Sequence, residues 1–192
     1  MPIFMDVHIV PGIKARDVAE AHRRDLLYQD DYDCKCMTYW IDEARENVFC
    51  LIEAPAREAV EAMHSRAHGL IPNRIIEVRN EVVESFLGRI YDPENAEISD
   101  GLKIINDPSF RVLLVTSIAD PVLLKHELGI DKANELLSRH NNIIRKNISL
   151  HGGSEAEHCG CGFIISFASA AKAVNCALAI QKDMSVTNAD VL

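Results

Sequence analysis

The chain has 192 residues, of which 48% are hydrophobic and 26% are charged, and its formal net charge is −9. This composition is typical of a folded globular protein, and the length allows one large domain or two small ones. The acidic balance disfavours binding to nucleic acids and to anionic membranes, because both depend on Lys and Arg side chains that meet phosphates. We therefore expect no nucleic-acid partner and no membrane partner, and favour a cationic ligand.

The sequence has no apolar stretch near the roughly 20 residues that span a membrane, and residues 1–6 lack the basic region of a signal peptide. We therefore expect a cytoplasmic protein. Its six cysteines would then be reduced thiols, because the cytosol disfavours disulfides. Cys34 and Cys36 flank one lysine, and Cys159 and Cys161 flank one glycine. Thiols grouped in this way suit soft or borderline metal ions.

The first 80 or so residues alternate between strand and helix patterns. Strands are indicated by alternation with period two or by β-rich runs, and helices by apolar side chains that recur on one side. The order predicts an α+β fold of the ferredoxin-like βαββαβ type, as in dimeric α/β barrels. Helices cover one face of its sheet, so we expect the other face to meet a second subunit or the rest of the chain. The predicted elements are a strand at 3–10, a helix at 14–32, strands at 34–41 and 48–53, a helix from Pro55 to Gly69 and a strand at 75–79.

The remainder of the chain predicts a second, partial α/β module. We expect a first domain at residues 1–82, a connector at 83–108 and a second domain at 109–192. The elements expected in the second domain are a strand at 110–116, a helical stretch at 121–150 with a break near Gly129, a hairpin at 154–167 and a helix at 170–184.

Two pairs of polar residues have the spacing of metal ligands. Asp6 and His8 lie two apart on a predicted strand, so their side chains leave the same face. Such a polar pair on an otherwise apolar strand must find partners when it is buried. His64 and His68 lie four apart on a predicted helix, the spacing at which two imidazoles can hold one ion. The alternative for this second pair is an ordinary solvated helix face.

Further candidate ligands are His22 and the pair Cys34 and Cys36. His22 lies within the apolar stripe of the first helix, which also includes Leu26, and His22 could also be a core histidine bonded to a carbonyl. Cys34 and Cys36 leave one face of the second strand. Imidazole, thiolate and carboxylate together suit nickel, zinc, copper or iron, and the order of affinities does not choose among these metals.

Several stretches of the first 80 residues resemble a family of small bacterial nickel-binding proteins. The resemblance implies a ferredoxin-like fold and nickel binding, with Asp6, His8, His22, His64 and His68 as the matching ligand positions. The Cys34-Lys35-Cys36 pair is less clearly a feature of that family, so its role rests on thiol chemistry. The matching stretches are Phe4-Met5-Asp6-Val7-His8, Ala21 to Leu26, Tyr39 to Glu43, Val48 to Pro55 and His64 to Leu70.

Residues 112–182 resemble the first part of a class III nucleotide cyclase domain. Such cyclases hold two metal ions on two aspartates, and the matching positions here are Ser117 and Cys161. Because magnesium requires oxygen ligands in octahedral geometry, we expect no cyclase activity. The stretches that carry the resemblance are Leu136 to His140, His151 to Gly153, Gly160 to Phe163 and Ala177 to Gln181.

The loop with His158, Cys159 and Cys161 is a possible second thiol site. It could bind a soft metal or react with an oxidant, or it could be a degenerate turn with incidental thiols. We predict a non-catalytic protein that binds nickel, in metal homeostasis or sensing, and forms a homodimer or higher homo-oligomer. The alternatives are a regulatory protein that uses the inactive cyclase-like half for interaction, and a metal-dependent enzyme of unknown substrate.

Overall fold

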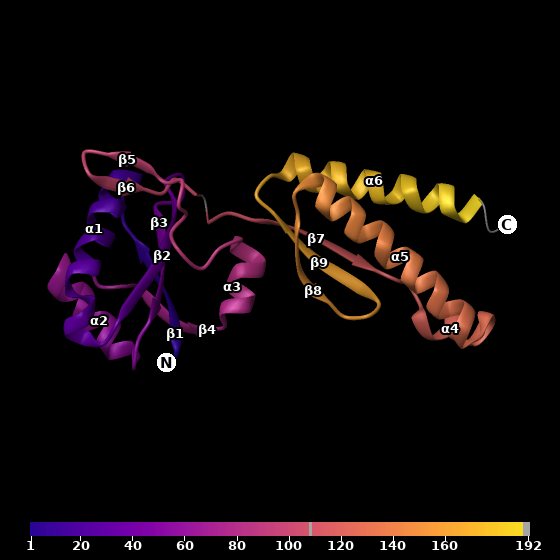
Figure 1. The fold of residues 1–192 in the computed structure, drawn as a ribbon, viewed down its shortest axis with the longest axis horizontal. Coiled ribbons are helices and arrows are strands. Elements are labelled where there is room, and N and C mark those ends of the chain that lie inside the picture. Colours follow the sequence, from indigo (N-terminus) through magenta and orange to yellow (C-terminus); the bar gives the residue numbers. More distant parts are fainter. Residues whose placement is uncertain (108, 190–192) are drawn as a thin grey trace. The chain divides into compact units, whose positions relative to one another are not determined.

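The computed structural model describes residues 1–107 and 109–189. The chain forms two compact units, the first ending at Phe110 and the second starting at Arg111 (Figure 1). The boundary predicted from the sequence lay at residues 108 and 109. Within the described part, no helix combines the length and the apolar character needed to cross a membrane.

The first unit has the predicted ferredoxin-like topology. Its sheet has the strand order β2-β3-β1-β4, and all neighbouring strands are antiparallel. This arrangement confirms the predicted βαββαβ order. The elements are β1 (Ile3–Ile9), α1 (Ala15–Tyr28), a 3-10 turn (Gln29–Tyr32), β2 (Lys35–Asp42), β3 (Asn47–Glu53), α2 (Arg57–Ala67) and β4 (Arg74–Val78).

The face of this sheet that the two helices cover contains both apolar and ionisable side chains. On β1, Phe4, Asp6 and His8 are all buried, at alternating positions of the strand. Phe4 belongs to a core cluster with side chains of α1 and α2, such as Val18 and Val60. Asp6 and His8 lie on the same face, so the period-two pattern of the sequence places the two polar side chains inside the protein.

The opposite face of the sheet is covered by α3 (Asn80–Leu87), which follows β4 directly. Val83 of this helix is buried in a cluster with Met37, Trp40 and Leu51, whose side chains leave that face of the sheet. The rest of the chain therefore covers this face of the sheet. This is one of the two possibilities expected from the sequence, the other being a second subunit.

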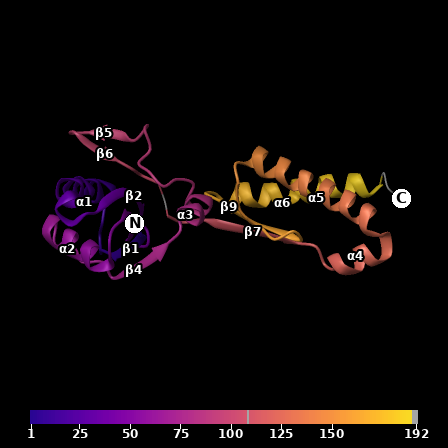
Figure 2. The same cartoon turned by 60° about the horizontal axis from the view of Figure 1, so that its bottom comes forward.

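A small hairpin continues this segment. It consists of β5 (Glu97–Ser99) and β6 (Leu102–Ile104), as Figure 2 shows. The strand β6 contacts α1. Leu102 and Ile105 join the core on the helix side of the sheet. Much of the segment predicted as a connector thus forms regular structure that completes the first unit.

Arg89 fixes this segment to the sheet. Its Nε donates a hydrogen bond of 3.0 Å to Asp107 Oδ2, and its guanidinium lies 4.5 Å from the centre of the Trp40 ring. Two further hydrogen bonds run from the guanidinium to Thr38 Oγ1 and to the carbonyl oxygen of Tyr39. A planar guanidinium suits this combination of stacking and several hydrogen bonds.

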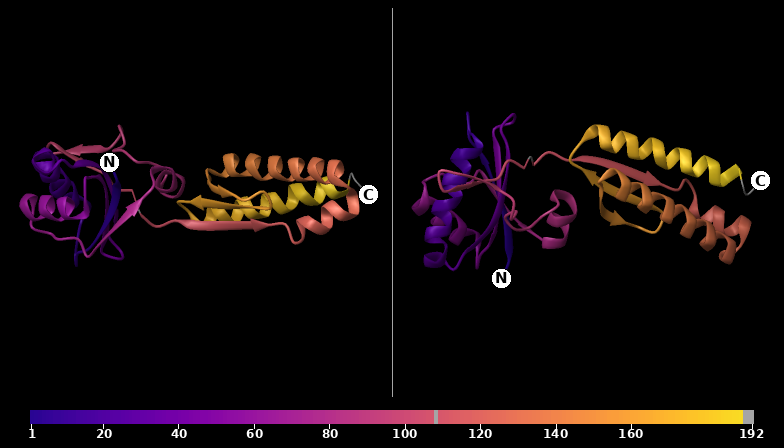
Figure 3. Two further views of the ribbon diagram at one scale, coloured as in Figure 1. Left: turned by 90° about the horizontal axis from the view of Figure 1, so that it is seen from below. Right: turned by 45° about the horizontal axis from the view of Figure 1, so that its top comes forward.

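The second unit is a three-stranded antiparallel sheet of order β7-β9-β8 with helices packed on it (Figure 3). Asp120 caps α4 by accepting from the backbone N–H of Leu123 at 2.8 Å, and Gly129, with φ of 78°, separates α4 from α5. The predicted elements are all present, and the last helix extends beyond residue 184. They are β7 (Val112–Ser117), α4 (Pro121–Leu128), α5 (Ile130–His151), β8 (Ser154–His158), β9 (Gly162–Phe167) and α6 (Ala170–Ala189).

Substitution of Arg89 tests the role of this anchor. Arg89→Met should lower the free energy of unfolding of the first unit by about 1–3 kcal/mol, because it removes the stacking on Trp40 and charge-assisted hydrogen bonds. Urea unfolding followed by the fluorescence of Trp40, the one tryptophan of the chain, measures this change. The matched control is Arg57→Met on the exposed side of α2, which should stay within about 0.5 kcal/mol of the wild type.

Candidate metal centre

Five ionisable side chains meet between the sheet and the two helices of the first unit. Asp6 and His8 come from β1, Asp25 from α1 and His64 from α2. His68 is the residue that ends α2, with φ of −148° and ψ of −5°. The ring centres of His64 and His68 are 4.9 Å apart, so the spacing of four residues brings the two imidazoles together even though His68 is no longer helical.

His64 lies at the centre of this cluster and contacts a carboxylate on each side. Its Nε2 is 2.7 Å from Asp6 Oδ2, and its Nδ1 is 3.0 Å from Asp25 Oδ1. The Nδ1 atom also lies 3.0 Å from Nε2 of His68. One imidazole therefore links the strand β1 to the helix α1.

The remaining contacts complete two groups of possible ligands. His8 Nε2 is 3.2 Å from Asp6 Oδ1, and His68 Nε2 is 3.1 Å from Asp25 Oδ1. The first group is Asp6, His8 and His64, the second is Asp25, His64 and His68, and the donor atoms of each group all lie within 4.8 Å of one another. The two groups share His64, which contributes a different ring nitrogen to each.

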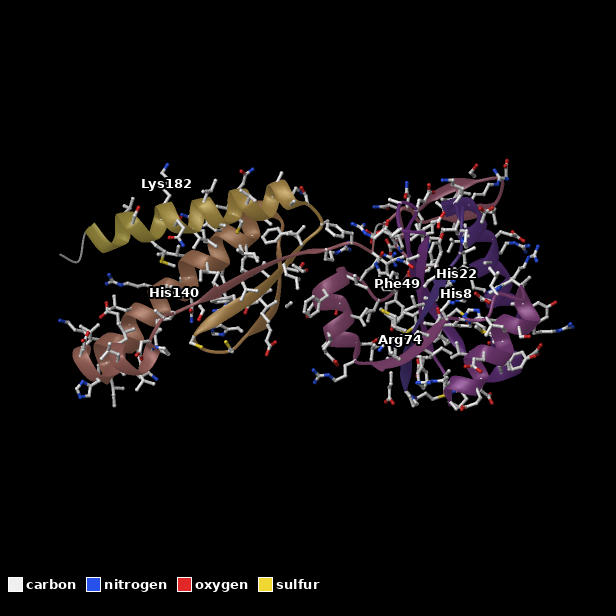
Figure 4. The ribbon with its side chains drawn as sticks, turned by 180° about the vertical axis from the view of Figure 1, so that it is seen from behind. His8, His22, Phe49, Arg74, His140 and Lys182 are labelled. Atoms are coloured by element: carbon white, nitrogen blue, oxygen red, sulfur yellow. The ribbon has the colours of Figure 1, made fainter. Side chains whose placement is uncertain are left out.

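The cluster is shielded from solvent but not tightly filled. Asp6 and His64 are 0% exposed and Asp25 is 3% exposed. A cavity of about 30 Å³ adjoins the cluster, lined by both polar and apolar side chains, among them His8 and His22 (Figure 4). This volume is enough for one water molecule or one ion.

The charges of the cluster are strongly coupled. Burial acts to raise the pKa of Asp6, but hydrogen bonds with His64 and His8 outweigh it and lower that pKa to about 2. Burial likewise acts to lower the pKa of His64, but hydrogen bonds with Asp25 and Asp6 raise it to about 10. The pKa of Asp25 is lowered by its bonds with His64 and His68, against the effect of burial. At neutral pH a charged imidazole thus lies between two carboxylates.

The donor atoms of this cluster fit a transition-metal ion. Metal–nitrogen bonds of about 2.1 Å place two ligands of one ion no more than about 4.2 Å apart. The contacts of 2.7 and 3.2 Å that join Asp6 to His64 and His8 fall within this limit. The same distances are hydrogen bonds when a proton lies between the atoms, so an ion would take the place of protons. Imidazole with carboxylate is a donor set for nickel, zinc, copper and iron.

His22 lies next to this cluster and not within it. Its Nε2 is 3.4 Å from Asp92 Oδ2, a distance and geometry that leave this buried nitrogen without a hydrogen bond among the described residues. Its ring lies 5.1 Å from that of Tyr39. Burial acts to raise the pKa of Asp92, but the contact with His22 outweighs this effect, so the pKa of Asp92 is lowered. His22 therefore lines the cavity, but neither ligand group includes it.

The predicted pair of thiol ligands is not brought to the histidines. Cys34 and Cys36 are buried, and neither belongs to a ligand group of the described residues. The Sγ of Cys36 lies 3.6 Å from the Sδ of Met63, and β2 changes register between Cys36 and Thr38. Burial raises the pKa of Cys34 to about 11 and that of Cys36 further, so both thiols are neutral in the metal-free chain.

The sequence analysis missed two carboxylates, Asp25 within this centre and Asp92 beside it. The hydrophobic pattern of α1 placed Leu26 inside, but Leu26 is 42% exposed and Asp25 is buried. Asp25 lies three residues after His22, on the same side of the helix, and this spacing was the available signal. Asp92 comes from the segment after β4, and no pattern in its neighbourhood points to His22.

In the second unit, the thiols of the other predicted site are in contact. Cys159 Sγ and Cys161 Sγ are 3.7 Å apart, whereas the ring of His158 stacks on Phe163 with a centroid distance of 4.4 Å. Ser117 pairs with Gly162 in the sheet, so it lies beside Cys161. Ser117 and Cys161, which the sequence analysis compared with two cyclase aspartates, are therefore neighbours at one end of the sheet.

Residues 4–78 match the model of a family described as nickel responsive protein SCO4226-like. SCO4226 from Streptomyces coelicolor A3(2), a protein of known crystal structure, is 37% identical over 40% of this chain and 94% of its own, with a TM-score of 0.37. The chain belongs to the SCO4226-like family. The family match falls in the first unit, as the resemblance of the sequence implied. No curated protein matches the chain.

Two bacterial light-regulated adenylyl cyclases are also similar to the chain. One is 11% identical, covering 96% of this chain and 66% of its own with a TM-score of 0.38. The other is 12% identical, covering 100% of this chain and 68% of its own with a TM-score of 0.39.

The buried charges predict how the stability of the metal-free protein depends on pH. The pKa of His64 is about 10 in the folded chain against 6.5 for the free imidazole, so the folded chain keeps a proton that the unfolded chain releases. The contribution of His64 to the free energy of unfolding should therefore be fully present near pH 6 and decline between pH 6.5 and about 8.5, where cysteines of the unfolded chain begin to titrate, by up to about 1.4 kcal/mol per pH unit. Urea unfolding followed by Trp40 fluorescence measures this slope.

His64→Gln is the variant for this measurement, because its side chain does not titrate. It should be less stable than the wild type at pH 6.5 and should lack most of the decline between pH 6.5 and about 8.5. His126→Gln, at an exposed position on α4, should keep the wild-type slope over this range. A wild-type stability that stays constant from pH 6.5 to 8.5 would contradict the charged state of His64.

Proposed function

We propose that this protein binds a divalent transition-metal ion, nickel first among the candidates, at the cluster around His64, and that it does so without catalysing a reaction. The observation that carries the proposal is the pair of ligand groups joined at His64. The description of the family as nickel responsive supports nickel over zinc, copper or iron. The donor atoms alone suit all four metals.

The group of Asp6, His8 and His64 is the primary binding position in this proposal. The second group is constrained by the backbone N–H of Leu70, which donates to Nδ1 of His68 at 3.1 Å. An ion on Nε2 of His68 would require the proton of the neutral ring on Nδ1, against the N–H of Leu70. His68 joins the site only if this bond opens.

Metal binding at this site must compete with a proton. His64 is charged in the metal-free protein, and a ligating imidazole nitrogen must be unprotonated. The carboxylates of Asp6 and Asp25 remain negative and compensate the charge of the incoming ion. Affinity should therefore rise with pH, and each ion should displace about one proton from His64.

A role in metal homeostasis or sensing is part of the proposal, and the origin of the ligands supports it. Asp6 and His8 belong to β1, His64 to α2 and Asp25 to α1. An ion held by Asp6, His8 and His64 would connect the sheet to α2, and Nδ1 of His64 would remain bonded to Asp25 of α1, so binding and the stability of the first unit should be coupled. The predicted homodimer or higher homo-oligomer remains part of the proposal, and light scattering of the metal-free and nickel-loaded chain measures it.

The proposal of no catalysis rests on the second unit. Ser117 and Cys161 lie where the resemblance to cyclases would place two magnesium-binding aspartates, and neither side chain supplies a carboxylate. The carboxylate of the nearby Asp120 is engaged as the cap of α4. An assay of the full chain with ATP or GTP and magnesium should show no cyclic nucleotide.

Nickel titration of the full chain without an affinity tag tests the binding proposal. Wild-type protein should bind at least one nickel ion, and His8→Gln and His64→Gln should each weaken binding at least tenfold, since each removes a ligand. His126→Gln again serves as the matched control, because it removes an exposed histidine elsewhere. Trp40 fluorescence shows whether each variant is folded. Equal affinity of folded His8→Gln, folded His64→Gln and the wild type would contradict the site.

Calorimetry in two buffers of different ionisation enthalpy tests the competition with protons. Nickel binding near neutral pH should release about one proton per ion, because His64 is charged before binding. Binding without proton release would contradict the proposal that the ion replaces the proton of His64.

A further inference from the structure

The turn between β8 and β9 holds two thiols that the proposed metal centre does not use. Cys159 and Cys161 occupy this turn, and their sulfur atoms are 3.7 Å apart. Cys159 is exposed and Cys161 is partly exposed. The other cysteines of the chain, Cys34, Cys36, Cys50 and Cys176, are all buried.

Backbone contacts hold this turn in its present shape. The N–H of Cys159 donates to the carbonyl of Gly162 at 3.1 Å, and the N–H of Ile118 donates to the carbonyl of Cys161 at 2.8 Å. Gly160 has φ of +79°, a conformation that favours glycine. A Cβ on Gly162 would lie 2.1 Å from the carbonyl oxygen of Thr116, so only glycine fits there. The fold therefore keeps the two thiols in contact.

The same surroundings argue against a metal site at this turn. Neither cysteine belongs to a group of three possible ligands among residues 1–107 and 109–189. His158 is stacked on Phe163, and its Nδ1 lies 3.5 Å from a guanidinium nitrogen of Arg145. Two thiols alone would leave half of a tetrahedral coordination shell unfilled.

We propose that Cys159 and Cys161 are a redox-active dithiol that closes reversibly to an intramolecular disulfide by exchange with a low-molecular-weight disulfide. The exposed Cys159 thiolate attacks one sulfur of that disulfide, which forms a mixed disulfide and releases one small thiolate. The Cys161 thiolate then attacks the sulfur of Cys159 and releases the second small thiolate. The protein dithiol loses two electrons and two protons, and the small disulfide gains them as two thiols.

Two features make this exchange selective and reversible. Cys34, Cys36, Cys50 and Cys176 are buried, and a thiol without solvent access reacts poorly with a dissolved disulfide. A disulfide between residues two apart closes a very short loop, which strains the bond, and this turn is exposed. Strained and exposed disulfides are reduced more easily than buried structural ones. The turn therefore responds to the surrounding thiol–disulfide balance, whereas the other four thiols do not.

Treatment of the full native chain with oxidised glutathione under anaerobic conditions tests this proposal. Two of the six thiols should disappear, and the tryptic peptide of residues 147–172, which contains Cys159 and Cys161 and no other cysteine, should lose the mass of two hydrogen atoms. Dithiothreitol should restore both thiols. Cys161→Ser should stop at the mixed disulfide and keep glutathione on Cys159. Cys176→Ser is the matched control and should react like the wild type.

Three outcomes would overturn the proposal. The first is a wild-type chain in which both thiols of the turn remain open to alkylation at high oxidised glutathione. The second is a wild-type chain that keeps glutathione on Cys159, as the Cys161→Ser variant is expected to do. The third is protection of both thiols from alkylation by one equivalent of zinc, which would assign the turn to metal binding.

Discussion

The first unit depends on one buried interaction, the contact of His64 with a carboxylate on each side. A charged group inside a protein is strongly unfavourable unless it is paired and hydrogen-bonded. Here the pairing joins Asp6 of β1 to His64 of α2 at 2.7 Å, and His64 to Asp25 of α1 at 3.0 Å. The interaction therefore fixes both helices on the sheet, and it also leaves a set of atoms that an ion can take over from protons. Stability and metal binding draw on the same groups.

This dual role explains which parts of the site could be predicted from the sequence. Asp6 and His8 follow from the alternation of one strand, and His64 and His68 follow from helical spacing, because both periods are local. Asp25 is buried only because its partner, His64, lies 39 residues further along the chain, so a hydrophobic pattern placed Leu26 inside instead. Cys34 and Cys36 were predicted to share a face, but Cys34 precedes β2, the register of β2 shifts after Cys36, and neither thiol belongs to a ligand group of the described residues.

The sequence predicted the fold to about the same extent as it predicted the site. The βαββαβ order and the elements of the second unit follow from short-range periodicity and from turn residues such as Gly129. Residues 83–108 read as a connector because their contacts are with distant residues. Arg89, for example, stacks on Trp40 and bonds to Asp107, and neither contact has a local signature. The chemistry of the two units is also distinct, with imidazole and carboxylate in the first and an exposed dithiol in the second.

Anomalous diffraction at the nickel edge, from crystals of the untagged full chain grown with nickel, tests the central claim most directly. The account predicts a peak between β1 and α2, within about 2.1 Å of Nε2 of His64 and next to Asp6 and His8. Nickel peaks confined to surface residues, with the hydrogen bonds of His64 to Asp6 and Asp25 left in place, would contradict it.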